Sequence, residues 1–467
     1  MSQVYTSKAM TKIDIRTLAP RLCKFAFFVM FVGFVFMLFL GHYFRVGFPV
    51  ALYLVAVAMM CVVADRSELI ALAISCSAFP AVFQYRYAVI LIMAAYFIKN
   101  IGDFYYSGKG SDNNYAPLLL LFAMIFWEVL HVAVYAQSAI EYLRSIVELL
   151  FIFMLLVENR KKYDYPKIVR YVSFAALSSC VLILLIQMKF GAYKSIVDYF
   201  SANRFGYGVE KYGDFDANFN PNGLALICVV SVCALVHVLL SGKSKFIDII
   251  FIFALFIFSL MTMSRKVILM YALLFLFVFF NLLNVKKRGI LKSILILVLT
   301  ALAMVLALKL LNDLLPTVME RFSERLSTED ISNGRLDLFE EYNALISSDI
   351  GVALFGWGIQ GIDAFHKQYG IVNVTHNGTQ EIIVCWGITG LIMFALMLLI
   401  FFKRVGKGKK IGLLNCLLLA EVLLFAQFAQ LIRSSGVMMF LAYAYVAMTF
   451  DGEKNRLKNG NKSGYAA

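Results

Sequence analysis

Charged residues are scarce in this chain, and their scarcity argues against an ordinary soluble domain. Of the 467 residues, 15% are Asp, Glu, Lys or Arg and 61% are hydrophobic, and the mean hydropathy is +0.80. Soluble domains carry about 25% charged residues. The apolar residues form repeated runs of roughly 20 residues, which is the length a helix needs to cross a bilayer. Because these runs are continuous rather than alternating, they predict helices and not a transmembrane barrel.

Cysteine pairs and nucleotide-binding motifs are also lacking. The eight cysteines lie in or at the edge of apolar runs and include no C-x-x-C pair, so neither disulfides nor a thiolate metal site is expected. No P-loop pattern occurs, and no inward-facing segment is large enough for a nucleotide-binding domain. These absences exclude a primary pump.

The apolar runs predict an all-α polytopic membrane protein with about fourteen transmembrane helices. The approximate spans are 25–42, 47–64, 68–83, 87–102, 115–137, 140–157, 169–190, 222–240, 246–262, 266–285, 291–312, 379–401, 411–432 and 434–450. The N-terminal segment is basic, and the first apolar run is too long for a cleaved signal peptide. We therefore interpret it as a retained helix in a single membrane domain covering 1–467.

The basic residues predict the orientation of these spans. The net charge is +14, yet nucleic acid is a poor explanation because most basic residues lie in short loops. Such loops face the cytoplasm in membrane proteins, and an even number of spans puts every strongly basic loop there. Both termini are then cytoplasmic, and 191–221 and 313–378 are exterior. Arginine is enriched among the exterior basic residues. A guanidinium grips phosphate oxygens in pairs, so a phosphate-bearing ligand is one explanation and ordinary loop salt bridges are the other.

Several predicted spans contain polar residues, mostly in their outer halves. An intramembrane charge costs at least ~2.5–3.5 kcal/mol at mid-bilayer, so these residues should line a hydrated cavity or pair with one another. Ion pairs that only hold the helices together are the alternative. The residues concerned are Glu128, His131, Glu141, Arg144, Glu148, Glu421, Gln427, Gln430 and Arg433.

The first exterior loop contains two motifs. Asn220-Pro221-Asn222-Gly223 is a turn that leads into a helix, where Asn222 is suited to cap the helix start and free amides suit an anion. Asp214-Phe215-Asp216 has the D-x-D spacing of metal-dependent glycosyltransferases. A lone D-x-D is weak evidence, so no metal is expected.

The second group of candidates begins at an outward hairpin and ends where the chain re-enters the membrane. Arg265, in Ser264-Arg265-Lys266, should lie at the mouth of the bundle, facing a phosphate or lipid headgroups. Arg335 opens an amphipathic helix of roughly 335–347, placed on the membrane surface or on the bundle. His376 stands at the start of a span, where imidazole is suited to act as a general base near neutral pH. Asn377 and Gln380 are placed to orient its ring or hold a sugar hydroxyl.

Five motifs in this order resemble the O-antigen ligase and polymerase superfamily: NPNGLAL, SRK, GRLDLFEEYNAL, FGWGIQG and HNGTQEIIVCWGITGL, within about 204–395. The resemblance implies a GT-C-like membrane glycosyltransferase that takes glycan from an undecaprenyl-pyrophosphate carrier without cofactor or metal. It implies Arg265 and Arg335 as pyrophosphate ligands and His376 as the base. Arg204 matches more loosely, because the paired arginine-x-glycine pattern of the polymerases is not clean here.

The sequence thus predicts a polymerase of lipid-linked repeat units for O-antigen, capsule or exopolysaccharide, on the outer face of a bacterial cytoplasmic membrane. Its partners would be the lipid-linked oligosaccharide, membrane lipid and possible companions such as a chain-length regulator and a repeat-unit flippase. One alternative is a ligase that transfers the glycan to another acceptor. The other is a flippase or transporter of similar lipids, although the internal repeats and broken helices typical of transporters are not evident in the sequence.

Overall fold

A computed structural model shows a helical bundle, with every regular element in the described residues a helix. The structure describes residues 15–44, 46–79, 85–107, 115–135, 143–158, 163–191, 193–202, 204–206, 220–283, 335–359, 361–370, 375–406, 410–429, 431–432 and 436–450, and isolated positions between 298 and 324. The predicted all-helical class is confirmed for these residues.

Helices form where the sequence is continuously apolar. In the first half of the chain they are α1 (Ile15–Tyr43), α2 (Val50–Val63), α3 (Arg66–Ser77), α4 (Tyr85–Ser107), α5 (Ala116–Tyr135), α6 (Leu143–Val157), α7 (Tyr165–Phe190) and α8 (Ile196–Ala202). The later helices are α9 (Pro221–Leu240), α10 (Phe246–Met261), α11 (Arg265–Leu283), α14 (Arg335–Ser348), α15 (Ile350–Leu354), α16 (Ile362–Tyr369), α17 (Gly378–Gly406), the 3-10 turn η1 (Leu413–Cys416), α18 (Leu417–Gln427) and α19 (Val437–Thr449).

Five of the described helices are long and apolar enough to cross a membrane: the Leu22–Tyr43 part of α1, α5 up to Val134, α7, α9 and α17. Each predicted span except 291–312, most of which lies outside the described residues, overlaps a helix. The chain is therefore a helical membrane protein, while the number of crossings remains a prediction.

The third predicted span, 68–83, differs from the structure. The helix found there, α3, ends at Ser77 and has 12 residues, which is about 18 Å of helix against roughly 30 Å of hydrocarbon. All of its residues from Ser67 to Ser77 are buried, and it packs against α7 and α4. In the structure α3 is therefore a short interior helix that is covered by its neighbours.

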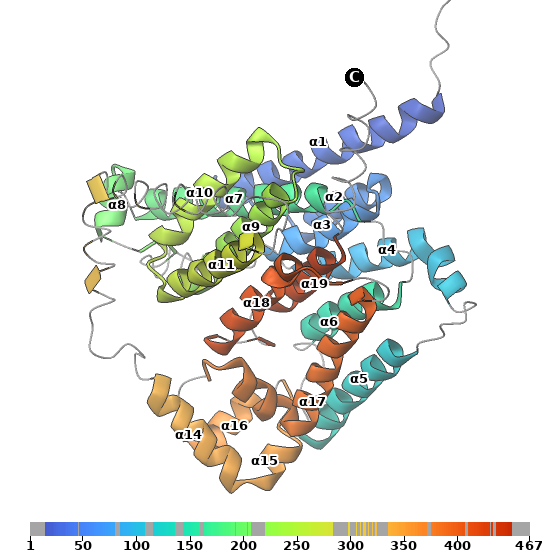
Figure 1. The fold of residues 1–467 in the computed structure, drawn as a ribbon, viewed down its shortest axis with the longest axis vertical. Helices are drawn as coiled ribbons and strands as arrows, with labels where there is room; N and C mark the ends of the chain where they lie inside the picture. Colours follow the sequence, from blue (N-terminus) through green and yellow to red (C-terminus); the bar gives the residue numbers. More distant parts are fainter. Residues whose placement is uncertain are drawn as a thin grey trace, which may run out of the picture.

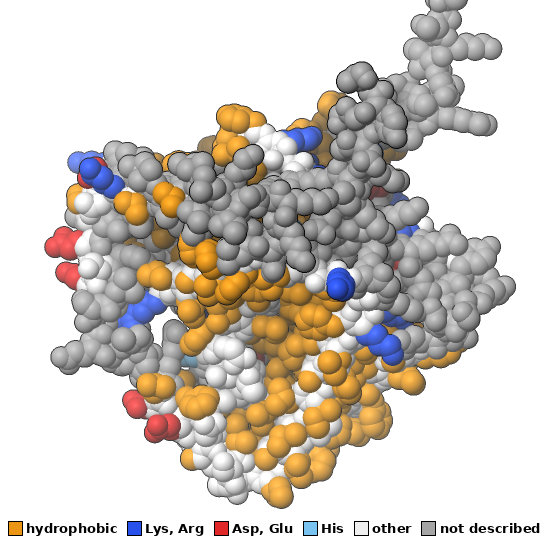
Figure 2. Space-filling view, in the orientation of Figure 1, with side chains coloured by type: hydrophobic (Ala, Val, Ile, Leu, Met, Phe, Trp, Pro, Cys, Tyr) orange, Lys and Arg blue, Asp and Glu red, His pale blue; other side chains and the backbone are white. Residues whose placement is uncertain are grey.

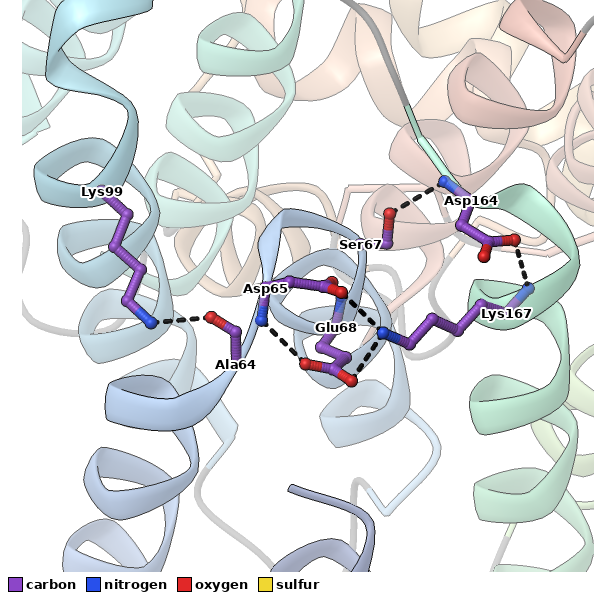
Figure 3. A network of polar contacts seen from close by, with 7 residues as sticks. All are labelled: Ala64, Asp65, Ser67, Glu68, Lys99, Asp164 and Lys167. Carbon is purple, nitrogen blue, oxygen red and sulfur yellow. Dashed lines mark hydrogen bonds and ion pairs between the residues drawn. The ribbon is translucent and has the colours of Figure 1, made fainter. Parts of the chain in front are cut away.

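One end of the bundle is joined by ion pairs between helix termini, and we call it the Lys167 end. Lys167, at the start of α7, bridges Asp65 and Glu68 at the start of α3, each at 2.6 Å (Figure 3). Arg66 reaches Glu158 at the end of α6 at 2.6 Å. Arg170 pairs with Asp248 of α10 at 2.8 Å. These contacts gather helix ends that the predicted topology places on one side of the membrane.

The opposite end, which we call the His376 end, contains the starts of α9, α11 and α17. Beside it lie α14, α15 and α16, which form the lower edge of the view next to the first part of α17 (Figure 1). The predicted amphipathic helix 335–347 corresponds to α14. Its Tyr342 is buried and its Leu338, Leu345 and Ile346 pack against the core, so its apolar face lies on the bundle.

Exposed apolar side chains continue from α5 and α17 onto α15, along the lower part of the face in Figure 2. On α15 and the residue after it they are Ile350, Leu354 and Phe355, which are 75%, 41% and 53% exposed. Val134, near the end of α5, is 70% exposed. Two membrane-length helices and α15 therefore share one apolar surface.

Candidate functional site

The turn between α10 and α11 brings three of the predicted residues together. Arg204 donates from Nε to the carbonyl oxygen of Thr262 at 3.1 Å. The side-chain oxygen of Asn222, in the first turn of α9, accepts from the Ser264 hydroxyl at 2.8 Å. Arg265 follows Ser264 as the first residue of α11. Residues that precede and follow the segment 207–219 thus meet at this hairpin, which we call the hairpin cluster.

Two details of the hairpin cluster are new relative to the sequence. Asn220, rather than Asn222, caps α9, since its side chain accepts from the Asn222 amide at 3.0 Å. Pro221 at the first helical position leaves one amide fewer to satisfy. Met263 has a φ of 49°, in a region that L-residues with long side chains rarely adopt. Such strain, at about 1–3 kcal/mol, is commonly held at functional sites.

The start of α17 forms a second cluster around the predicted base. Asn377 caps the helix, because its side-chain oxygen accepts from the amides of Thr379 at 2.9 Å and Gln380 at 3.1 Å. Thr375 is buried, and its hydroxyl donates to Gln380 at 3.1 Å. His376, between them, is exposed. The local fold therefore turns the imidazole outward while it fixes the backbone on both sides.

Gln380 acts as a clamp on α14. Its side-chain nitrogen donates to the Phe339 carbonyl oxygen at 2.8 Å and to the Asn343 side chain at 2.9 Å, and it is 4% exposed. With both ends of its amide bonded to protein, Gln380 holds α14 against the start of α17. Arg335 begins α14, one helical turn before Phe339, while its side chain lies outside the described residues.

The end of α18 joins the two clusters. Lys266 donates to the carbonyl oxygen of Phe428 and lies over the Phe425 ring at 4.6 Å. On the α17 side, Thr379 bonds to Gln427 at 3.1 Å. The starts of α11 and α17 therefore flank the same two residues, 427 and 428. Sequence reasoning assigned no role to Lys266; its position next to Arg265 was the only available signal.

Glu381 strengthens this junction. It is 0% exposed, and one carboxylate oxygen accepts from the backbone amides of Leu431 and Ile432, the second at 3.0 Å. A buried carboxylate that receives two amide bonds is a stable anchor. Glu381 thereby fixes the chain beyond α18 to α17.

Helix α17 is broken at Gly387, whose φ of 69° and ψ of −172° are not helical. The carbonyl oxygens freed by the break accept hydrogen bonds from the turn after α15: the Trp357 amide donates to Val384 at 2.8 Å and the Gly358 amide to Cys385 at 2.6 Å. The third freed carbonyl oxygen, that of Trp386, accepts from the Trp127 indole of α5 at 3.0 Å. Irregular backbone inside an apolar helix requires such partners. The sequence analysis did not predict this break.

Glu128 and His131 of α5 hold the same segment, the turn of residues 355–359. Glu128 is 1% exposed and accepts from the Ile359 amide at 3.1 Å and from the Trp386 indole at 2.5 Å. His131 is 5% exposed and contacts the carbonyl oxygens of Trp127 at 2.7 Å and Phe355 at 2.8 Å. These contacts tie α5 to the turn 355–359 and to α17.

Asp349 caps α15 and is the clearest electrostatic feature of helices α14, α15 and α16. Its carboxylate accepts from the Tyr369 hydroxyl at 2.5 Å and from the Gly351 amide at 2.8 Å. The hydrogen bond from Tyr369, helped by the Val352 and Gly351 amides, lowers the pKa of Asp349 below its usual value. The ionised cap ties α15 to α16.

Some predicted residues cannot be placed. Asp214, Asp216, Glu141, Gln430 and Arg433 lie outside the described residues, and so does the side chain of Arg144. Within the described residues, no group of three or more His, Cys, Asp or Glu side chains is arranged to hold a metal ion.

The structure thus brings Arg204, Asn222 and Arg265 into one cluster and His376, Asn377 and Gln380 into another, both at the same end of the bundle. Asn377 and Gln380 have structural contacts there that account for their side chains. Searches against known protein families and curated proteins find no match for this chain.

Proposed function

We propose that the protein is a membrane glycosyltransferase that polymerises undecaprenyl-pyrophosphate-linked oligosaccharide repeat units on the outer face of the bacterial cytoplasmic membrane. The observation that carries the proposal is the meeting of two motifs far apart in sequence. Lys266, next to Arg265, binds residue 428, and Thr379, three residues after His376, binds residue 427. A cationic hairpin and an exposed imidazole on either side of one turn suit a phosphate leaving group and a hydroxyl nucleophile.

The proposed chemistry is an exchange of bonds at the anomeric carbon of the donor sugar. An acceptor hydroxyl attacks this carbon, its proton passes to the His376 imidazole, and the bond to the lipid pyrophosphate breaks. The leaving pyrophosphate needs positive charge rather than a proton, because its oxygens are already weakly basic. Arg265, with Arg335 and Arg204 as further candidates, would supply that charge as paired hydrogen bonds.

The test is transfer of purified lipid-linked repeat units by protein in lipid. His376→Ala and His376→Gln should each lower turnover by between about 100-fold and 10,000-fold, which is the usual contribution of a general base to the rate of a reaction. Donor binding, measured separately, should survive because the arginines remain. His366→Gln serves as the control, since His366 is bonded to Tyr342 at 2.7 Å in the same exterior segment. Near-normal turnover in His376→Gln would remove His376 as the base.

The ligase alternative uses the same site and differs in the acceptor. In the same assay, a polymerase extends one lipid-linked glycan with another, whereas a ligase transfers glycan only when a different acceptor is added. The length of the lipid-linked product therefore separates the two.

A transporter of lipid-linked oligosaccharide is supported by a different observation, the carboxyl of Glu421 in α18. This residue is 0% exposed. One of its oxygens lies 3.5 Å from the Cys233 thiol, and the other has no hydrogen-bond partner within the described structure. An unpaired buried carboxylate costs several kcal/mol, so Glu421 is held neutral, as a proton-binding group in a transporter would be. Proton uptake that accompanies lipid-linked sugar movement in vesicles and is lost in Glu421→Gln would favour transport over transfer.

A further inference from the structure

The two ring nitrogens of His131 both face groups that can only accept hydrogen bonds. Nδ1 lies 2.7 Å from the Trp127 carbonyl oxygen and Nε2 lies 2.8 Å from that of Phe355. A neutral imidazole carries one N–H and one lone pair, so it can donate to only one of them. Both contacts are favourable only when both nitrogens are protonated. The geometry therefore assigns an imidazolium to His131.

The counter-charge is supplied three residues earlier on the same helix. Glu128 receives only donors, the Ile359 amide and the Trp386 indole, as expected for a carboxylate, and it lies within electrostatic reach of His131. The turn 355–359 adds no titratable side chain. The neighbouring helices α17 and α6 add the buried thiol of Cys385 and the buried carboxyl of Glu148.

His131 and Glu128 hold the turn 355–359 at two points, and this turn fills the break in α17. His131 holds the Phe355 carbonyl and Glu128 holds the Ile359 amide, while Trp357 and Gly358 bond to the freed carbonyls of α17. Gly356 lets the two backbones meet, since a Cβ there would lie 2.6 Å from the Cys385 backbone. The four elements α5, α15, the turn and α17 are thereby locked together.

We propose that protonated His131, together with the Glu128 carboxylate, is a positioning device for the candidate site. The two side chains seat the turn 355–359 in the break of α17 and so hold α14–α16 beside His376. Loss of the proton would leave one nitrogen lone pair facing a carbonyl oxygen, and one of the two contacts would open. The device therefore works in the protonated state. Its effect on transfer rests on the proposed function, whereas the protonation and seating do not.

The chain offers an internal reporter of this device, because all three tryptophans lie at it. Trp127 stacks on Phe355 with ring centres 5.8 Å apart and meets His131 edge-on at 5.5 Å. Trp386 bonds to Glu128, and Trp357 belongs to the turn. Tryptophan emission of the full-length protein consequently reports the seating of the turn without any added label.

The first experiment is nitrogen NMR of the ¹⁵N-histidine-labelled full chain in lipid nanodiscs at neutral pH, with the His131 signals assigned by their loss in His131→Gln. Two protonated ring nitrogens are expected. A neutral tautomer, with one protonated and one unprotonated nitrogen, would overturn the proposal. Neither outcome depends on knowing the substrate.

The second experiment compares the tryptophan emission of variants at one neutral pH. His131→Gln and Glu128→Gln should each shift the emission from that of wild type, because each removes a side chain that holds the turn 355–359. His366→Gln, the control, should match wild type. Wild-type emission in both His131→Gln and Glu128→Gln would show that the turn is not seated by this pair.

The third experiment measures transfer. A displacement of reacting groups by about 1 Å costs on the order of 100-fold in rate, so His131→Gln should lower kcat to that extent with little change in KM. His131→Lys, which keeps the charge, should restore part of it. Unchanged kcat in His131→Gln with the NMR result as expected would leave the protonation of His131 real and reject its role in positioning. A failure of transfer in wild type would instead reject the proposed function alone.

Discussion

Arg265 and Lys266 are adjacent cations with different surroundings, and this difference separates a candidate ligand from an anchor. Lys266 is 8% exposed. Its ammonium donates to the Phe428 carbonyl oxygen and lies over the Phe425 ring. Arg265 is only half-buried and stands at the strained Met263 turn. A guanidinium there presents a planar fork that an ammonium does not reproduce.

Arg265→Lys should therefore impair polymer formation although the charge is kept. A loss of at least about tenfold in transfer rate is expected, which corresponds to roughly 1.4 kcal/mol. Product length and transfer rate are measured at matched protein levels. Arg404→Lys, at the far end of α17, is the control and should behave as wild type. Normal product from Arg265→Lys would remove this residue from the pyrophosphate site.

At the scale of single elements, the break in α17 is the feature that most shapes the site. An unbroken helix would offer no carbonyls to the turn 355–359, and α15 would lose its seat beside α5. A Cβ at residue 387 would clash with the carbonyl group of Leu354, and the positive φ there is one that residues with a side chain rarely adopt. Glycine is therefore required at this position.

Gly387→Ala should destabilise the protein by about 1–3 kcal/mol, the cost of one strained backbone position, and should also change tryptophan emission. Reversible unfolding in mixed micelles gives the free energy. Gly33→Ala in α1 is the matched control, because a Cβ there meets nothing within 4 Å. Equal stabilities of the two variants would contradict the strained break.

The cap of α15 gives a pH-dependent prediction. The pKa of Asp349 is lowered in the folded protein, so its contribution to stability is complete above the ordinary carboxyl pKa and is lost as the pH falls through the lowered one. Tyr369→Phe removes the largest cause. Acid loosening of α15, followed by hydrogen exchange of residues 350–354, should then begin at higher pH than in wild type. Tyr115→Phe, at an exposed position, should not shift it.

At the scale of the whole molecule, the ion pairs between helix termini and the two candidate-site clusters lie at opposite ends of an apolar bundle. Ion pairs join helix termini at the Lys167 end, and the arginine and histidine clusters occupy the His376 end. The basic-loop asymmetry predicts that the Lys167 end is cytoplasmic. The proposed chemistry on a lipid-linked sugar outside the membrane requires this orientation.

Cysteine labelling in a cysteine-free background checks that orientation. Glu340→Cys on α14 should react with an impermeant reagent in intact cells. Lys410→Cys, in the loop before η1, should react only after the membrane is permeabilised. Both positions are exposed, so accessibility to the reagent is decided by the membrane. The opposite pattern would reverse the topology and withdraw the exterior site.

The sequence by itself determined the helical membrane class, the approximate helix positions and α14, because continuous apolar runs and helical periodicity are local properties. It also determined which residues to test, since Arg265 and His376 stand at span boundaries. Only the tertiary structure decided that α3 is interior, that α17 is broken at Gly387 and that Asn377 and Gln380 hold the fold. These features depend on partners more than ten residues away, such as Trp357 for Val384 and Phe339 for Gln380. The charge of His131 belongs to the same group, because it is dictated by a carbonyl 224 residues along the chain.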